Sequence, residues 1–206
     1  MSKQFQTLAW AAFLIIVAGA IYYAVTRSDT QGTSATAGSD GSGQGAQPVE
    51  ILKYSDYSCP SCKQYIPFQE ALEDEFGDLV SIEYRHFPLG SFPHSDLAAR
   101  AVEAAAEQGE KEAMHDMIFD GQAEWSNGPA EEIFLSYAEE LGLDIDQFRS
   151  DLESDEVRQR VLRDRAEGER RMVRATPTFF INGQRVQQNP RDYQQFKALV
   201  EMHMYR

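Results

Sequence analysis

The chain contains two cysteines, Cys59 and Cys62, which are separated by Pro60 and Ser61. Thiols at this spacing can close a small disulfide ring when the second lies one helical turn after the first. A sulfur at the N-terminus of that helix would be stabilised as a thiolate, because free N–H groups and the helix dipole favour negative charge there. The pair is a redox site, part of a metal site or incidental, and the expected helix position favours redox chemistry.

The residues around the pair predict the strand and the helix that would position it. Val49 to Ser55 is rich in β-forming residues and predicts a buried strand. Pro60 suits the first turn of a helix, where its missing N–H is no loss. Apolar residues at helical spacing follow, and Gly77 ends the run. These apolar residues are Tyr65, Phe68, Leu72 and Phe76.

Residues 1–27 have the composition of a membrane anchor. The chain is uncharged from Gln4 to Thr26, and Leu8 to Val25 is almost wholly apolar. At about 1.5 Å rise per residue, a helix of this length would cross the roughly 30 Å hydrocarbon core of a bilayer. A cleaved signal peptide is the alternative. Because the small-residue motifs at 18–20 and 35–37 are poorly placed for cleavage, we expect an uncleaved single-pass anchor with the rest of the chain outside the cytoplasm.

The next segment, residues 28–47, predicts a flexible linker. It is rich in glycine, serine and threonine and has no aromatic or large aliphatic side chain, so it cannot form a core. The folded domain is expected to occupy residues 48–206. The net charge of −14 makes nucleic acid an unfavourable partner, since phosphates would be repelled. The four histidines are scattered over different predicted elements, so we expect neither a metal site nor a bound cofactor.

Beyond the first strand and helix, the pattern predicts a mixed α/β fold with a helical insertion at about 95–172. A second strand is expected from Leu79 to Phe87, and a strand at 176–181 with a turn at Asn182-Gly183 is expected after the insertion. Gln184 to Val186 would be the return strand, and a last helix would run from about 190 to 202. The insertion is predicted to begin with a helix that Ser95 or Asp96 caps and that runs through Ala105. Further helices are predicted over Glu110 to Phe119, Pro129 to Leu141, Asp144 to Leu152 and Asp155 to Met172.

From about Val49 to Val200 the chain resembles the DsbA-like family of thioredoxin-fold disulfide oxidoreductases, particularly its membrane-anchored members. A lone C-x-x-C motif is weak evidence, but its combination with a distant Thr-Pro-Thr-Phe-Phe motif is specific. The residues that carry the resemblance are Asp56 to Cys62, Tyr84 to Leu89, His94, Ala105 to Gly109, Met114 to Phe119 and Thr176 to Gly183.

The resemblance implies a thioredoxin fold whose helical insertion lies between the second strand and the strand after a cis Pro177. It also implies a reactive Cys59, a buried partner Cys62, and Thr176 backbone groups that pair with an extended peptide. Such proteins donate their disulfide to newly exported polypeptides, and a quinone-linked membrane partner reoxidises them. A reductase or isomerase of the same fold, and a non-catalytic peptide-binding or metal-delivery module, remain alternatives.

Two positions depart from the family pattern. The pair between the cysteines lacks the histidine of some members, and Ser61 offers at most a hydroxyl hydrogen bond, so a weaker oxidant is expected. Lys53 stands where related proteins commonly carry a buried carboxylate. It either extends to the surface from a strand end, or lies near Cys62 and lowers thiol pKa values or acts as a base.

Several neighbouring residues have both a structural and a functional interpretation. Asp56 would raise the pKa of a nearby thiol, and a turn-capping role is favoured for it. Tyr57 and Phe179 belong either to a peptide-binding groove or to the core. His94 and His115 are expected to pack or cap within the helical insertion.

Overall fold

The computed structural model describes residues 45–206. The predicted anchor at 1–27, and the predicted linker at 28–47 except for its last three residues, lie outside the described residues. Among residues 45–206, no helix combines the length and the apolar character needed to cross a membrane. The folded domain begins slightly earlier than predicted, because the N–H of Gln47 donates a 2.8 Å hydrogen bond to the carbonyl of Met204 and Ala46 packs against the core.

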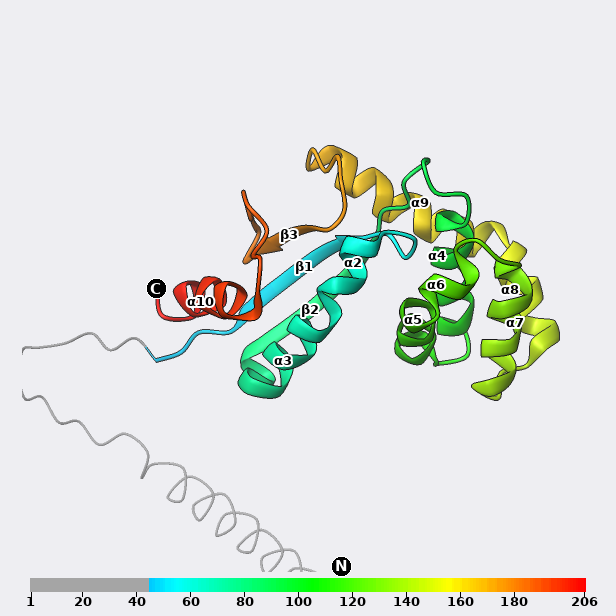
Figure 1. Ribbon diagram of the computed structural model, residues 1–206, viewed down its shortest axis with the longest axis horizontal. Coiled ribbons are helices and arrows are strands. Elements are labelled where there is room, and N and C mark those ends of the chain that lie inside the picture. Colours follow the sequence, from blue (N-terminus) through cyan, green and yellow to red (C-terminus); the bar gives the residue numbers. More distant parts are fainter. Residues whose placement is uncertain (1–44) are drawn as a thin grey trace, which may run out of the picture. The chain divides into compact units, whose positions relative to one another are not determined.

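A four-stranded sheet in the order β2-β1-β3-β4 forms the centre of the domain (Figure 1). Strand β1 (Val49–Ser55) pairs in parallel with β2 (Val80–His86) and antiparallel with β3 (Thr178–Ile181). β3 continues antiparallel into β4 (Gln184–Arg185). Because β1 has a neighbour on each side, most of its residues are buried, as the sequence predicts.

Helices cover both faces of the sheet. On one face, α3 (Ile66–Phe76) and α10 (Tyr193–Met204) pack against Ile51 and other alternate residues of β1. On the opposite face lies α9 (Asp155–Arg170), where Gly168 permits close approach. A Cβ atom at Gly168 would meet the rings of Phe87 at 2.8 Å and Tyr54 at 2.9 Å, so a larger residue would push the helix away.

The helical insertion between β2 and β3 is confirmed, and α4 (Ser95–Ala106) is its centre. The alanines of α4 from Ala98 to Ala105 are fully or almost fully buried, which lets the surrounding helices pack closely around it. These are α5 (Lys111–Asp120), α7 (Ala130–Glu140), α8 (Ile145–Glu153) and α9, whereas the short α6 (Gln122–Trp125) contacts α5.

Three details of the helices differ from the sequence-based prediction. The helix after Cys59 is two segments, α2 (Pro60–Gln64) and α3, with Tyr65 between them. Pro67 explains the break, because it has no N–H to donate to the carbonyl four residues earlier. α4 begins after His94 without a side-chain cap, since the Ser95 hydroxyl donates to Asp56 instead. The short helix α6 was not predicted.

Candidate active site

The two cysteines lie where β1 leads into α2. Cys59 is the N-cap residue of α2, with extended backbone angles, and Pro60 occupies the first turn, as predicted. Cys62 lies within α2 and is fully buried, whereas Cys59 retains 7% exposure. Pro60 and Ser61 are exposed. Both thiols are free, so the structure represents the reduced form.

The surroundings of Cys59 favour its thiolate. The pKa of Cys59 is lowered to about 5, first by a hydrogen bond with the Cys62 thiol and further by the N–H groups of Cys62 and Ser61 at the helix start. Burial opposes the shift without cancelling it. A thiolate at this position is a competent nucleophile and a good leaving group at neutral pH.

The surroundings of Cys62 have the opposite effect. Its pKa is raised far above the usual range, first by burial and then by its hydrogen bond with Cys59 and by the charge of that sulfur. The positive charge of Lys53 opposes the shift. The reduced pair therefore carries one negative charge on the outer sulfur and one proton on the inner sulfur at neutral pH.

Lys53 is completely buried in the middle of β1, so the interpretation that it extends to the surface is wrong. Its Nζ donates hydrogen bonds to the Cys62 carbonyl at 3.2 Å and to Gln69 Oε1 at 2.7 Å. The ammonium also lies 5.4 Å from the ring centres of Tyr84 and Phe119. Burial lowers the pKa of Lys53 to about 8, an effect that the nearby thiols partly offset.

The loop before β3 lies against the outer sulfur. Sγ of Cys59 is 3.5 Å from the carbonyl oxygen of Thr176, to which the protonated thiol donates. The Thr176–Pro177 peptide bond is cis, as the family resemblance implies. Asn189 holds this loop by donating from Nδ2 to the Pro177 carbonyl at 2.8 Å. The expected pairing of Thr176 with a substrate peptide stays a prediction.

The loop that carries Cys59 is held by two further side chains. The Asp56 carboxylate accepts hydrogen bonds from the N–H groups of Ser58 at 2.8 Å and Leu89 at 2.7 Å, which confirms the turn-capping role. Gln122 donates from Nε2 to the Cys59 carbonyl at 3.1 Å. Sequence reasoning missed Gln69, Gln122 and Asn189, since each acts on a segment far away along the chain.

The remaining candidates belong to the interior or to helix ends. Tyr57 and Phe179 are buried core residues rather than walls of a groove. His115 is buried in α5, and its Nδ1 shares a 2.8 Å hydrogen bond with the Tyr57 hydroxyl. Within residues 45–206, no group of three or more His, Cys, Asp or Glu side chains could hold a metal ion.

A C-x-x-C pair with opposed pKa shifts, beside a cis-proline loop on an α/β sheet, defines the class of thioredoxin-fold thiol–disulfide oxidoreductases. A family model described as Thioredoxin matches residues 38–202. The chain therefore belongs to the thioredoxin family.

Solved structures share this fold. A thioredoxin-like oxidoreductase from Silicibacter pomeroyi superposes with a TM-score of 0.63 and 27% identity, over 78% of this chain and 89% of that one. The oxidoreductase DsbA from Xylella fastidiosa gives a TM-score of 0.61 and 22% identity, over 77% and 91%. BdbD from Bacillus subtilis gives a TM-score of 0.61 and 20% identity, over 78% of this chain and 92% of that one. Because the last two structures are 22% and 20% identical to this chain, they show a similar fold and nothing about function.

Curated relatives carry a similar segment within a longer protein. The Na(+)/H(+) antiporter NhaA 3 of Salinispora tropica is 40% identical over 141 residues, which cover 67% of this chain and 21% of that protein. The Na(+)/H(+) antiporter NhaA of Herminiimonas arsenicoxydans is 38% identical over 138 residues, with the same coverage. The chain thus spans about a fifth of the length of these relatives.

Proposed function

We propose that the protein is a thiol–disulfide oxidase that donates the Cys59–Cys62 disulfide to reduced exported polypeptides. The observation that carries this proposal is the opposed shift of the two thiol pKa values. A stabilised Cys59 thiolate stabilises the reduced enzyme, and a disulfide whose reduced form is stabilised is a stronger oxidant. The surroundings of the pair therefore favour transfer of the disulfide to a substrate.

The reaction proceeds in two exchange steps. A substrate thiolate attacks Sγ of Cys59, the less buried sulfur, forming a mixed disulfide while Cys62 leaves. A second substrate thiolate then attacks its partner sulfur in the mixed disulfide and releases Cys59 as a thiolate. The substrate loses two electrons and forms one disulfide, and the enzyme gains two electrons. Of the two protons released by the substrate thiols, one is taken up by Cys62 and the other passes to solvent.

Lys53 is proposed to assist the first step as a positioning residue. Because its ammonium is held against the Cys62 carbonyl, a positive charge is present where the departing Cys62 thiolate develops. A lysine with a pKa of about 8 also readily supplies the proton that Cys62 requires at neutral pH, and then recovers it from solvent. Lys53 would thus supply the proton to Cys62 from the position where related proteins carry a carboxylate.

The proposed location is the outer side of a cell membrane, to which residues 1–27 anchor the domain. The uncharged, apolar run in the sequence supports this proposal. The relatives named as Na(+)/H(+) antiporters also support it, since they join a similar segment to a protein named as an ion transporter. Reoxidation by a quinone-linked membrane oxidoreductase would complete the cycle.

The proposal is tested by oxidative refolding of a reduced, disulfide-dependent protein. We expect the oxidised full-length chain to restore activity to this substrate, and Cys59→Ser to be inert. If Cys59→Ser refolds the substrate as well as the parent chain, the proposed chemistry is wrong. Persistent peptide binding or metal transfer by Cys59→Ser, with its cellular role intact, would favour a binding or metal-delivery module instead.

The direction of exchange is decided by the reduction potential of the pair. Strong oxidants of this fold have potentials near about −120 mV, and thioredoxin lies near about −270 mV. The low Cys59 pKa predicts a potential less negative than that of thioredoxin, and the absence of a histidine between the cysteines predicts one below that of the strong oxidants. A potential near that of thioredoxin would favour the reductase or isomerase alternative.

A further inference from the structure

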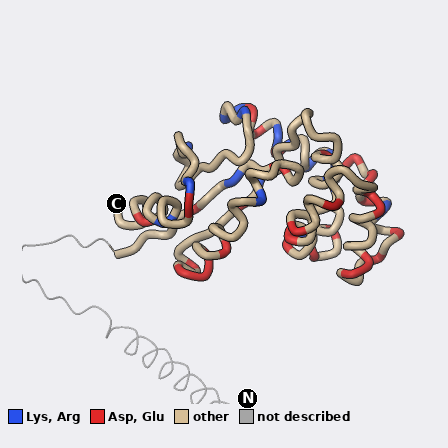
Figure 2. The backbone as a smooth tube through the Cα atoms, viewed as in Figure 1, with Lys and Arg blue, Asp and Glu red and all other residues tan. Residues whose placement is uncertain are grey.

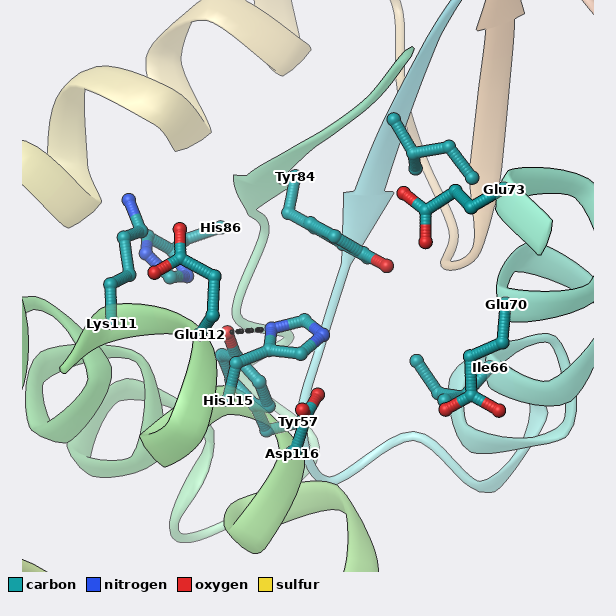
Figure 3. Close-up of a pocket in the computed structure, with 11 residues that line it drawn as sticks. Tyr57, Ile66, Glu70, Glu73, Tyr84, His86, Lys111, Glu112, His115 and Asp116 are labelled. Carbon is teal, nitrogen blue, oxygen red and sulfur yellow. Dashed lines mark hydrogen bonds between the residues drawn. The ribbon is translucent and has the colours of Figure 1, made fainter. Parts of the chain in front are cut away.

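A cavity of about 310 Å³ lies between the sheet and the helical insertion, and neither cysteine lines it. Its walls are α3, β2 and α5 (Figure 3). Acidic residues lie on both of the facing helices (Figure 2). Nothing in the proposed exchange reaction uses this space.

Four acidic residues line the cavity, and Glu70, Glu73 and Asp116 lie around its open space in Figure 3. Glu70 and Glu73 reach it from α3, and Asp116 reaches it from α5 on the other side (Figure 3). Burial, and then the charge of Glu70, raises the pKa of both Glu73 and Asp116. The mutual repulsion of these carboxylates makes the cavity favourable for a positive charge. The Tyr84 hydroxyl points into the same space from β2 (Figure 3).

His115 provides an independent indication of a ligand. The side chain is 7% exposed, and its Nδ1 is engaged by the Tyr57 hydroxyl. Its Nε2 points toward the open space in Figure 3 and has no hydrogen-bond partner among the described residues. Burial, followed by the charges of Lys53, His86 and Lys111, lowers the pKa of His115 to about 3, so the ring is neutral. A buried nitrogen without a partner is costly, and a ligand that binds it removes this cost.

The lysines nearest to the cavity are engaged elsewhere. Lys111 lines one end, but its Nζ lies 2.7 Å from Glu103 Oε1. Lys53 is held by the Cys62 carbonyl and by Gln69. Neither ammonium is therefore committed to the carboxylates of Glu70, Glu73 and Asp116.

We propose that this cavity binds a primary ammonium group on an aliphatic stem, either a lysine side chain of a polypeptide or a free diamine. An ammonium has three donors and no acceptor, and the cavity offers three carboxylates and the unpartnered Nε2 of His115. With Nε2 as acceptor, Nδ1–H donates to the Tyr57 hydroxyl oxygen. Ile66 and Ile82 supply apolar surface for the stem.

The test is a calorimetric titration of the full-length chain with cadaverine, with Nα-acetyl-lysine amide and with 1-pentanol as the uncharged control. We expect saturable one-to-one binding of one or both amines and no binding of pentanol. Binding of cadaverine alone would identify a free diamine as the ligand, and binding of the lysine amide would identify a polypeptide side chain. No saturable binding of either amine, or equal binding of pentanol, would overturn the proposal.

A pair of charge-matched variants separates the cavity from the general acidity of the surface. Glu73→Gln with Asp116→Asn should weaken amine binding at least about tenfold, because two charge-assisted contacts are lost. Glu131→Gln with Glu132→Gln, on the exposed start of α7, removes the same charge and should leave binding unchanged. Equal weakening by both variants would overturn the proposal.

A spectroscopic measurement tests the same contact without a substitution. The ¹⁵N resonance of His115 Nε2 should shift on saturation with the amine, because a hydrogen bond forms at that nitrogen. An unchanged His115 signal together with saturable amine binding would place the ligand elsewhere and contradict the proposal.

Discussion

Cys59 and Cys62 are the same side chain three positions apart, and their surroundings give them opposite chemistry. Around Cys59, a hydrogen bond with the partner thiol and the N–H groups of a helix start lower the pKa to about 5. Around Cys62, burial in the core raises the pKa far above its usual value. The difference shows that position sets the chemical role of each sulfur: the sulfur that is reachable is also the one that leaves most readily.

The largest expected effect comes from removing the inner sulfur. Cys62→Ser should reduce multiple-turnover oxidation of a dithiol peptide to background, because the enzyme can no longer form its own disulfide. Reaction of this variant with a peptide disulfide should instead leave a stable mixed disulfide at Cys59, visible on a non-reducing gel. Normal turnover by Cys62→Ser would show that the two sulfurs do not act as a pair.

The pH dependence of stability tests the outer sulfur. The Cys59 thiol has a pKa of about 5 in the folded protein and about 8.5 in the unfolded chain. Its ionisation therefore stabilises the reduced protein fully at pH values above about 8.5, and this stabilisation is lost as the pH falls through 5. At pH 7 the contribution is about 3 kcal/mol, from roughly 1.36 kcal/mol per pKa unit. Urea unfolding of the reduced parent and of Cys59→Ala should therefore differ by less at pH 4 than at pH 7. A pH-independent difference would contradict the shifted pKa.

A substitution at Lys53 changes the surroundings of Cys62 and leaves both cysteines in place. Lys53→Met keeps the side-chain length but removes the ammonium, so release of Cys62 as the mixed disulfide forms should slow by roughly tenfold or more. The rate should also lose its dependence on a group with a pKa near 8. Stopped-flow exchange with a model dithiol, followed across pH, measures both effects.

Lys63 provides the matched control for this prediction. It lies in α2, directly after Cys62, but its Nζ donates to the Asp120 carbonyl at 2.9 Å. Lys63→Met should leave the pH profile of exchange unchanged. If both lysine variants alter the profile equally, the effect is general electrostatics and not the buried contact of Lys53.

The smallest expected effect is at the exposed position between the cysteines. Ser61→His introduces a group that is cationic at mildly acid pH beside the Cys59 thiolate, and should lower the Cys59 pKa by up to about one unit. One unit corresponds to about 30 mV in the potential of a two-electron couple. Equilibration of the variant with glutathione at pH 6 measures the change; a potential that becomes more negative would contradict the expected stabilisation.

Local sequence signals predicted the strands, most of the helices and the placement of the cysteine pair. These signals succeeded because each one determines the structure of its own neighbourhood. They are the β-formers in 49–55, the helical spacing after Pro60 and the glycine at position 77. The cis bond before Pro177 was implied by family resemblance and not by the local residues.

The sequence did not predict the contacts between segments that lie far apart along the chain. Ser95 was expected to cap α4, but its hydroxyl donates to Asp56, which precedes the cysteine pair. Lys53 had two open interpretations, because its burial depends on Gln69 and on rings from β2 and α5. One feature of the cavity could have been predicted: Glu70 and Glu73 have the spacing that puts them on one helix face. Their approach to α5 needed the structure.

The most direct test of the central claim is a titration of the Cys59 thiolate in the reduced protein, followed by its ultraviolet absorbance, with Cys59→Ser as the blank. The opposed surroundings of the two sulfurs predict a single transition with a midpoint near pH 5 and no second thiolate up to pH 9. A midpoint near that of an ordinary cysteine, about 8.5, would contradict the account.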